Sequence, residues 1–238
     1  MSALLHAELL KLRTTRTFAV VVGTAAALSL ILVALGAILG EETDPHALFT
    51  NTSITYIIVL LSAIGMTGEW RHRTITGSVL AAPNRLRLLL AKALAAAAAG
   101  VVLSLLVTVA TMVVGTLVLD ARGEETLGLG GLADVLWRNL AVAALLGPLG
   151  VAVGALVRNQ VVTIVGLIAV AAVVEPALSG AVPDVGRFGP LAGAPGGVLG
   201  GPDAAALLAP GLALAVLAAW ALAAFATAAW RLRTRDLI

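Results

Sequence analysis

The sequence contains no cysteine, which excludes disulfides, thiol catalysis and metal sites with cysteine ligands. Charge is scarce as well, since Asp, Glu, Lys and Arg make up 12% of the 238 residues, whereas an average soluble domain has about 25%. Hydrophobic residues account for 60% of the chain, and the mean hydropathy is +1.05. These values predict an integral membrane protein, because a soluble domain of this size does not need several apolar runs of about 20 residues.

Motifs for catalysis and nucleotide binding are also missing. The two lysines, Lys11 and Lys92, do not follow a glycine, so the chain has no P-loop of its own. The patterns H-E-x-x-H and G-x-S-x-G are absent. The histidines His6, His46 and His72 fall in separate polar segments, which argues against a metal site built from them. We therefore expect neither an enzyme nor a cofactor bound by this chain itself.

Six apolar segments predict an all-α membrane fold with a single transmembrane domain over residues 1–238. The segments long enough to cross a bilayer are residues 17–39, 48–68, 88–119, 139–157, 161–178 and 208–230. The third has 32 residues and would be about 48 Å long as a helix, so we expect it to tilt or to begin in the cytoplasm. Residues 120–138 are predicted to form a polar loop.

The N-terminal residues 2–16 have the pattern of a short helix, in which Leu5, Leu9 and Leu12 form one apolar stripe. This helix would lie on the inner leaflet, or the segment is a plain basic flank to the first span. The apolar run 17–39 is longer than the core of a signal peptide, and no cleavage site follows it. We therefore predict an uncleaved first span.

A basic segment, residues 69–92, separates the second and third spans. It holds five of the fifteen Lys and Arg residues: Arg71, Arg73, Arg85, Arg87 and Lys92. Each would cost roughly 2.5–3.5 kcal/mol at the centre of a bilayer, so the segment must face water or a soluble partner. We interpret it as a docking element on the cytoplasmic side. The alternative is a basic loop that binds anionic lipid headgroups.

The distribution of basic residues predicts the orientation. With six spans both termini lie on one side, and twelve of the fifteen Lys and Arg residues fall on that side, whereas ten of the thirteen acidic residues fall on the other. Cytoplasmic loops carry the excess of Lys and Arg, so both termini should be cytoplasmic. The net charge of +2 is small, and basic residues that flank apolar spans indicate contact with membrane lipid and not with nucleic acid.

Three features of the later spans carry further expectations. Pro148 should kink the fourth span, and the GxxxG spacing of Gly150 and Gly154 permits close helix contact, including a contact between two chains. Residues 179–207, rich in Gly and Pro, exclude an ordinary helix. They form either a plain outer loop or short re-entrant pieces shielded by protein.

Glu175 is the ionisable residue that falls inside a predicted span. An acid within a membrane is a functional candidate, so Glu175 could bind a cationic substrate, act as a gate or carry a proton. The alternative is that the helix ends at Pro176 and that Glu175 lies at the outer water interface.

These features together resemble the permease subunits of the type 2 ABC exporters over almost the whole chain. The motif of that family after the second span is an acid, Gly-Thr, a leucine pair, Pro, a basic residue and a later Lys. Here it is matched by Glu69, Thr74, Leu80, Pro83, Arg85 and Lys92. Arg73 replaces the glycine and Ala81 replaces the second leucine. The composition, rich in Ala, Gly and Arg, suits an actinobacterial relative.

The resemblance implies a working unit of two permeases and two separate ATPase subunits that bind ATP and Mg²⁺. The second permease would be another copy of this chain, giving a homodimer, or a sister permease. Residues of about 71–82 would form a coupling helix seated on the ATPase, and 179–207 would match an outer re-entrant hairpin that helps to close the exit. The residues assigned to docking are Glu69, Arg71, His72, Arg73, Thr74, Ile75 and Arg85. We also expect Glu69 to pair with Arg71 or Arg73.

The expected activity is export of a hydrophobic or amphipathic molecule, such as a drug, an antibiotic, a lipid or a peptide, because binding sites for such molecules are mostly apolar. An ATP-independent secondary transporter is a weaker hypothesis, since it favours midplane charges or broken helices in matched halves. A membrane scaffold that transports nothing remains open.

Overall fold

The structure is a computed structural model that describes residues 1–14, 16–39, 44–50, 52–77, 84–200 and 207–234. It is 87% helical, and the described residues contain no strand. Six helical segments are long and apolar enough to cross a membrane. The predicted all-α fold with six spans is therefore confirmed.

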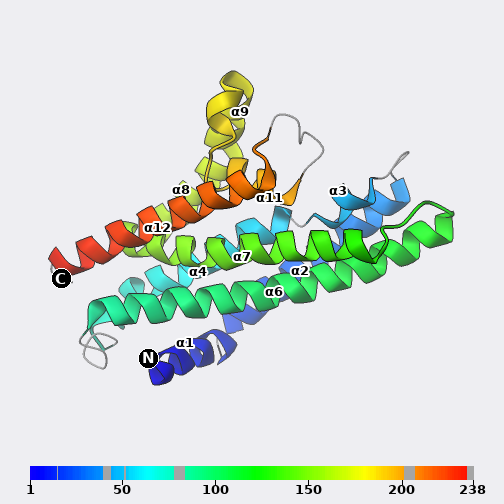
Figure 1. Cartoon of the computed structure of the whole chain (residues 1–238). Coiled ribbons are helices and arrows are strands. Elements are labelled where there is room, and N and C mark those ends of the chain that lie inside the picture. Colours follow the sequence, from blue (N-terminus) through cyan, green and yellow to red (C-terminus); the bar gives the residue numbers. More distant parts are fainter. Residues whose placement is uncertain (15, 40–43, 51, 78–83, 201–206, 235–238) are drawn as a thin grey trace.

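The bounds of the elements follow the chain in order (Figure 1). They are α1 Ser2–Thr14, α2 Arg16–Leu39, α3 Pro45–Phe49, α4 Thr52–Arg71, α6 Arg85–Arg122, α7 Leu129–Val157, α8 Gln160–Ala169, the π-helix η1 Val170–Val174, α9 Glu175–Ala181, α10 Pro183–Gly186, α11 Gly193–Leu199 and α12 Pro210–Thr234.

Helix α7 is the centre of the bundle and packs against α4, α6 and α12. Figure 1 shows these four helices running side by side along the long axis of the molecule. Val142, Ala143 and Leu146 of α7 are fully buried, and they join one core with Ile58 of α4 and Leu103 of α6. Close packing of this kind holds membrane helices together, because lipid gives no hydrophobic drive for helix association.

Small residues of α7 allow the close approach that the GxxxG spacing predicts, but the contact lies within one chain. A Cβ atom at Gly154 would lie 2.9 Å from the carbonyl oxygen of Ala63 in α4, and one at Gly150 would meet the carbonyl oxygen of Val59. Within the chain the motif packs against α4, and a contact between two chains stays a prediction. Helix α7 continues without a break through Pro148.

The polar loop predicted over residues 120–138 is wrong for most of its length. Helix α6 has 38 residues and runs to Arg122, where Gly123 caps it in the left-handed conformation with φ 71°. Helix α7 already begins at Leu129. Charged side chains do not stop a helix that extends beyond the apolar core, and Asp134 and Arg138 pair at i,i+4 on α7 with a distance of 2.7 Å between Oδ2 and Nε.

The fifth span, predicted over residues 161–178, does not end at Pro176, which was the end that one of the two interpretations of Glu175 required. It continues from α8 through the five-residue π-helix η1 and then through α9 to Ala181. A proline inside a helix clashes with the carbonyl four residues earlier. For Pro176 that carbonyl belongs to Ala172, which lies in the π-helix η1 and not in a regular α-helical turn.

The described part of the Gly- and Pro-rich region, residues 179–200 and 207, is built largely of short helices. Figure 1 shows α9 projecting away from the bundle and α11 returning beside α12. Ala194, Val198 and Leu199 are buried, because α11 packs against α7 and α12. Whether this region reaches membrane depth remains a prediction.

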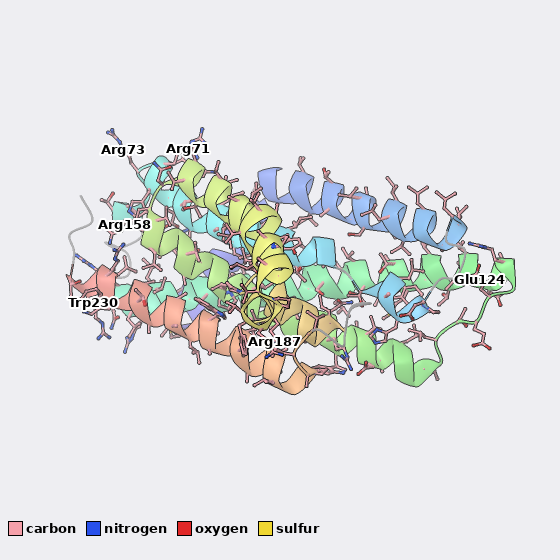
Figure 2. The ribbon with its side chains drawn as sticks, turned by 90° about the horizontal axis from the view of Figure 1, so that it is seen from above. Arg71, Arg73, Glu124, Arg158, Arg187 and Trp230 are labelled. Carbon is pink, nitrogen blue, oxygen red and sulfur yellow. The ribbon has the colours of Figure 1, made fainter. Side chains whose placement is uncertain are left out.

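Several arginines gather at one end of the bundle. Figure 2 places Arg71, Arg73, Arg158 and Trp230 at one end and Glu124 at the other. Helix α1 and the C-terminal end of α12 lie toward the basic end (Figure 1). The cytoplasmic location of both termini stays a prediction.

Candidate functional site

Four charged side chains from three helices meet at the basic end. The ammonium group of Lys92 in α6 lies 2.5 Å from Oε1 of Glu69 in α4 and 2.9 Å from Oε2 of Glu8 in α1. The ammonium group of Lys11 in α1 lies 2.9 Å from Oε1 of Glu8 and 3.1 Å from Oε1 of Glu69. We call these four residues the ion network, and it joins α1, α4 and α6.

Burial makes the ion network sensitive to loss of a member. Lys92 is 6% exposed and Glu69 is 8% exposed. Buried charges are costly unless they are paired, so each cation here is matched by carboxylates. Oε2 of Glu69 is also buried and has no hydrogen-bond partner among the described residues. Both lysines therefore bind Glu69 through Oε1.

The pKa values in α1 follow from these contacts. Burial alone would raise the pKa of Glu8, but the charges and hydrogen bonds of Lys92 and Lys11 outweigh it and lower that pKa below its ordinary value. Burial alone would lower the pKa of Lys11, and its bonds to Glu8 and Glu69 raise it instead. Both side chains are therefore held in their charged forms at neutral pH.

The predicted pairing of Glu69 with Arg71 or Arg73 is wrong, since Glu69 pairs with lysines. Helix α4 runs through Arg71, and residues two apart on a helix point to different faces. Arg71 instead donates from Nη1 to Oε1 of Gln160 at 3.2 Å. Arg73 lies in the turn after α4 with φ 55° and is exposed.

The N-terminal segment is a separate helix, as one of the two interpretations expected. Its polar residues Glu8 and Lys11 face α4 and α6, and α1 packs along α6. This contact with the bundle adds a role that the sequence did not indicate. A position of α1 on the lipid surface remains a prediction.

The expected coupling helix begins later than residue 71. Residues 72–74 form a turn, and the described helical residues there are 75–77. Leu80, Ala81 and Pro83 of the motif lie outside the described residues. His72, Arg73 and Thr74 are exposed, so they present polar groups beyond the end of α4 (Figure 2 for Arg73).

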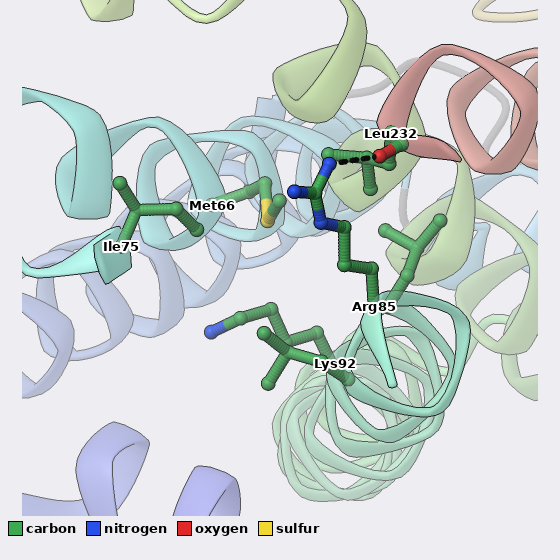
Figure 3. Close-up of a pocket in the computed structure, with 7 residues that line it drawn as sticks. Met66, Ile75, Arg85, Lys92 and Leu232 are labelled. Atoms are coloured by element: carbon green, nitrogen blue, oxygen red, sulfur yellow. Dashed lines mark hydrogen bonds between the residues drawn. The ribbon is translucent and has the colours of Figure 1, made fainter. Parts of the chain in front are cut away.

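Ile75 and Arg85, which we assigned to docking, make contacts inside the protein. Ile75 is 5% exposed and lines a small cavity of about 10 Å³ with Met66, Lys92 and Leu232. Nη1 of Arg85 donates to the carbonyl oxygen of Leu232 at 2.7 Å, while Lys92 points away from it (Figure 3). The start of the 75–77 helix is thus anchored against α4, α6 and α12.

A second basic contact at this end comes from the turn between α7 and α8. Arg158 caps α7 in the left-handed conformation with φ 59°, and its guanidinium carbon lies 5.8 Å from the ring centroid of Trp70. Cation–π contacts fall within about 6 Å. The sequence analysis did not predict the contact between Arg158 and Trp70. It also did not predict that Glu8 and Lys11 belong to the ion network, although their i,i+3 spacing was a signal that they could pair.

Glu175 is buried within the protein, with 2% of its surface exposed, and its depth relative to the outer water interface stays a prediction. Its carboxylate accepts hydrogen bonds from the backbone N–H groups of Leu191, Ala192 and Gly193. The described residues contain no group of His, Asp and Glu side chains that could hold a metal ion.

A comparison with protein families decides the class of the molecule. The model described as ABC-2 family transporter protein matches residues 4–174, from α1 to the end of η1. The chain belongs to this family. This ABC-2 protein is a membrane permease component of an ABC transporter, which implies an ABC ATPase subunit as its partner and a multi-pass location in the inner membrane. No curated protein matches the chain.

Proposed function

We propose that this ABC-2 permease moves a hydrophobic or amphipathic molecule outward, driven by ATP that a separate subunit binds with Mg²⁺ and hydrolyses. The family match is the observation that carries the proposal. The missing P-loop agrees with it, since the energy must then come from another chain. The second permease of the working unit would be another copy of this chain or a sister permease.

The docking surface in this proposal is the exposed turn after α4. Arg71, His72, Arg73 and Thr74 are exposed there, and a cleft on the ATPase with negative potential would be complementary to them. The same end carries the excess of basic residues, so it would face the cytoplasm, where the ATPase is found.

The contacts behind the turn support transmission of movement. Ile75 anchors the residues after the turn, the ion network joins α4 to α1 and α6, and Arg85 joins α6 to α12. A push on the turn would therefore displace the ends of four helices together. Helix α4 would then shift relative to α8, which packs on it, and this shift would change the opening between the spans.

The proposal is tested by copurification of the tagged permease with its ATPase and by the ATPase activity of the eluate. The double substitution Arg71→Glu and Arg73→Glu should abolish copurification and transport, because it reverses the charge of the docking surface. Glu125→Arg, a charge reversal at an exposed position beside Glu124 at the other end of the bundle, is the control and should leave both intact. Normal transport by the double variant would contradict the docking role, and a permease without any ATPase partner would contradict ATP-driven export.

A further inference from the structure

Glu175 is held by three successive backbone donors from the outer region. Its Oε1 accepts the N–H of Leu191 at 2.9 Å, and its Oε2 accepts the N–H groups of Ala192 at 2.5 Å and Gly193 at 3.1 Å. Hydrogen bonds to an ionised group are about twice as strong as neutral ones. The carboxylate therefore fixes residues 191–193 to the fifth span.

Glycines make room for this arrangement. A Cβ atom at Gly189 would lie 2.6 Å from Cδ of Glu175, and one at Gly186 would lie 2.5 Å from the Cα of Ser179. Cβ atoms essentially never come so close to other heavy atoms. The backbone can surround the carboxylate only because these positions lack side chains, so the contact is a built feature of the region.

The π-helix η1 ends at the residue before Glu175. The single extra residue of a π-helical turn changes which face the following side chains occupy, and such turns are frequent at functional sites. The family match ends at residue 174, so it does not include Glu175.

Leu191 connects this contact to a cavity. It is 3% exposed and lines a cavity of about 240 Å³ with Tyr56 and Leu60 of α4 and Leu167 and Ile168 of α8. The segment that carries Leu191 is also tied to the sixth span, where Nε1 of Trp220 donates to the carbonyl oxygen of Phe188 at 2.9 Å. The segment 188–193 is thus held between two spans, by Glu175 on one side and by Trp220 on the other.

We propose that Glu175 is a positioning residue that holds Leu191 in the wall of this cavity, where Leu191 narrows the space between α4 and α8, so that a shift of α8 and α9 relative to α4 carries Leu191 away and widens the cavity. This inference rests on the proposed function, in which α4 moves when the ATPase acts. The carboxylate is already occupied by three donors, so its role is to hold the segment 188–193 and not to bind a cationic substrate.

The natural absence of cysteine permits a direct test by thiol labelling. Leu191→Cys is introduced into the permease in complex with its ATPase, and the rate of reaction with a membrane-impermeant maleimide is measured. With Glu175 present the reaction should be slow, because position 191 is buried. With Glu175→Ala it should be roughly tenfold faster or more, since three charge-assisted hydrogen bonds are lost. Glu175→Gln, which keeps one acceptor oxygen, should restore part of the protection.

Two further variants keep the test decisive. Gly189→Ala places a methyl group against the Glu175 carboxylate and should accelerate labelling even if Glu175→Ala does not fold. Val185→Cys, 54% exposed in α10, is the control and should react equally fast in every background. Slow labelling of Leu191→Cys in both the Glu175→Ala and the Gly189→Ala backgrounds would overturn the positioning role.

Addition of ATP with vanadate separates this inference from the function on which it rests. With Glu175 in place, trapping the ATPase should change the labelling rate of Leu191→Cys, whereas in Glu175→Ala the rate should be fast and independent of ATP. If Glu175→Ala accelerates labelling but ATP has no effect with Glu175 present, the positioning role stands and ATP-driven movement is wrong.

Discussion

The ammonium group of Lys92 lies 2.5 Å from Oε1 of Glu69, although the two residues are 23 positions apart and belong to different helices. Glu69 is the first residue of the family motif around the docking turn, and Lys92 is the last. The pair therefore holds the two ends of the segment 69–92 together. Glu8 of α1 completes it from a distance of 84 positions, so the N-terminal helix is part of the same support.

Removal of Lys92 should destabilise the permease strongly. Lys92→Met leaves the carboxylates of Glu69 and Glu8 buried without their shared cation, and breaking a buried ion pair costs about 3–5 kcal/mol. The additional change Glu69→Gln removes one of these charges and should recover part of the loss. The thermal unfolding midpoint in detergent measures both effects. Arg87→Met, on an exposed position of α6, is the control, and equal midpoints for Lys92→Met and Arg87→Met would contradict the role of the pair.

Glu8→Gln should loosen α1 while the six spans stay folded. The substitution weakens the contacts of α1 to Lys92 and Lys11, and α1 has few other charged contacts to the bundle. Limited proteolysis with trypsin at Lys11 measures this loosening, and we expect faster cleavage in the variant. His6→Gln, exposed on the same helix, should be cleaved as slowly as the native protein. Unchanged cleavage in Glu8→Gln would show that apolar contacts alone hold α1.

Stability should fall in acid through Glu8. Its pKa is lowered in the folded protein from an ordinary value of 4.5, so its stabilising contribution is complete above that value and is lost as the pH falls through the lowered pKa. Lys11 acts at the other extreme, since its raised pKa means that its contribution is lost only as the pH rises above about 10.5.

The unfolding midpoint measured from about pH 6 to about pH 3 tests this sign. The native protein should lose stability more steeply than Glu8→Gln over that range. Asp184→Asn, whose side chain is 86% exposed, should follow the native curve. Parallel curves for the native protein and Glu8→Gln would contradict the contribution of Glu8.

Hydropathy predicted the six spans because long apolar runs have few alternatives to a membrane helix. It placed helix ends poorly where polar residues extend a helix beyond the apolar core, as in α6 and α7, and where a π-helical turn precedes Pro176. In both places packing in three dimensions decides the boundary, and the local sequence does not.

The sequence predicted some of the residues of the candidate site but not which of them pair with one another. The basic segment and the importance of Glu69 were visible, yet the expected partners Arg71 and Arg73 were chosen for nearness in sequence. The actual partner follows from the crossing of α4 and α6, which no local pattern encodes. The contact of Glu175 was hidden for another reason, because its partners are backbone N–H groups, and any residue except proline supplies one.

The contact between α7 and α4 gives a last prediction. Gly154→Val should destabilise the fold of the single chain by about 1–3 kcal/mol, the usual cost of overpacking, because a Cβ atom at this position would lie 2.9 Å from the carbonyl oxygen of Ala63. Gly166→Val is the matched control, since a Cβ atom there meets nothing within 4 Å in the single chain. The unfolding midpoint and the oligomeric state in detergent are measured together. A variant at Gly154 that keeps its midpoint but loses dimers would show that the GxxxG motif joins two chains, and a lower midpoint would show that it holds α7 against α4.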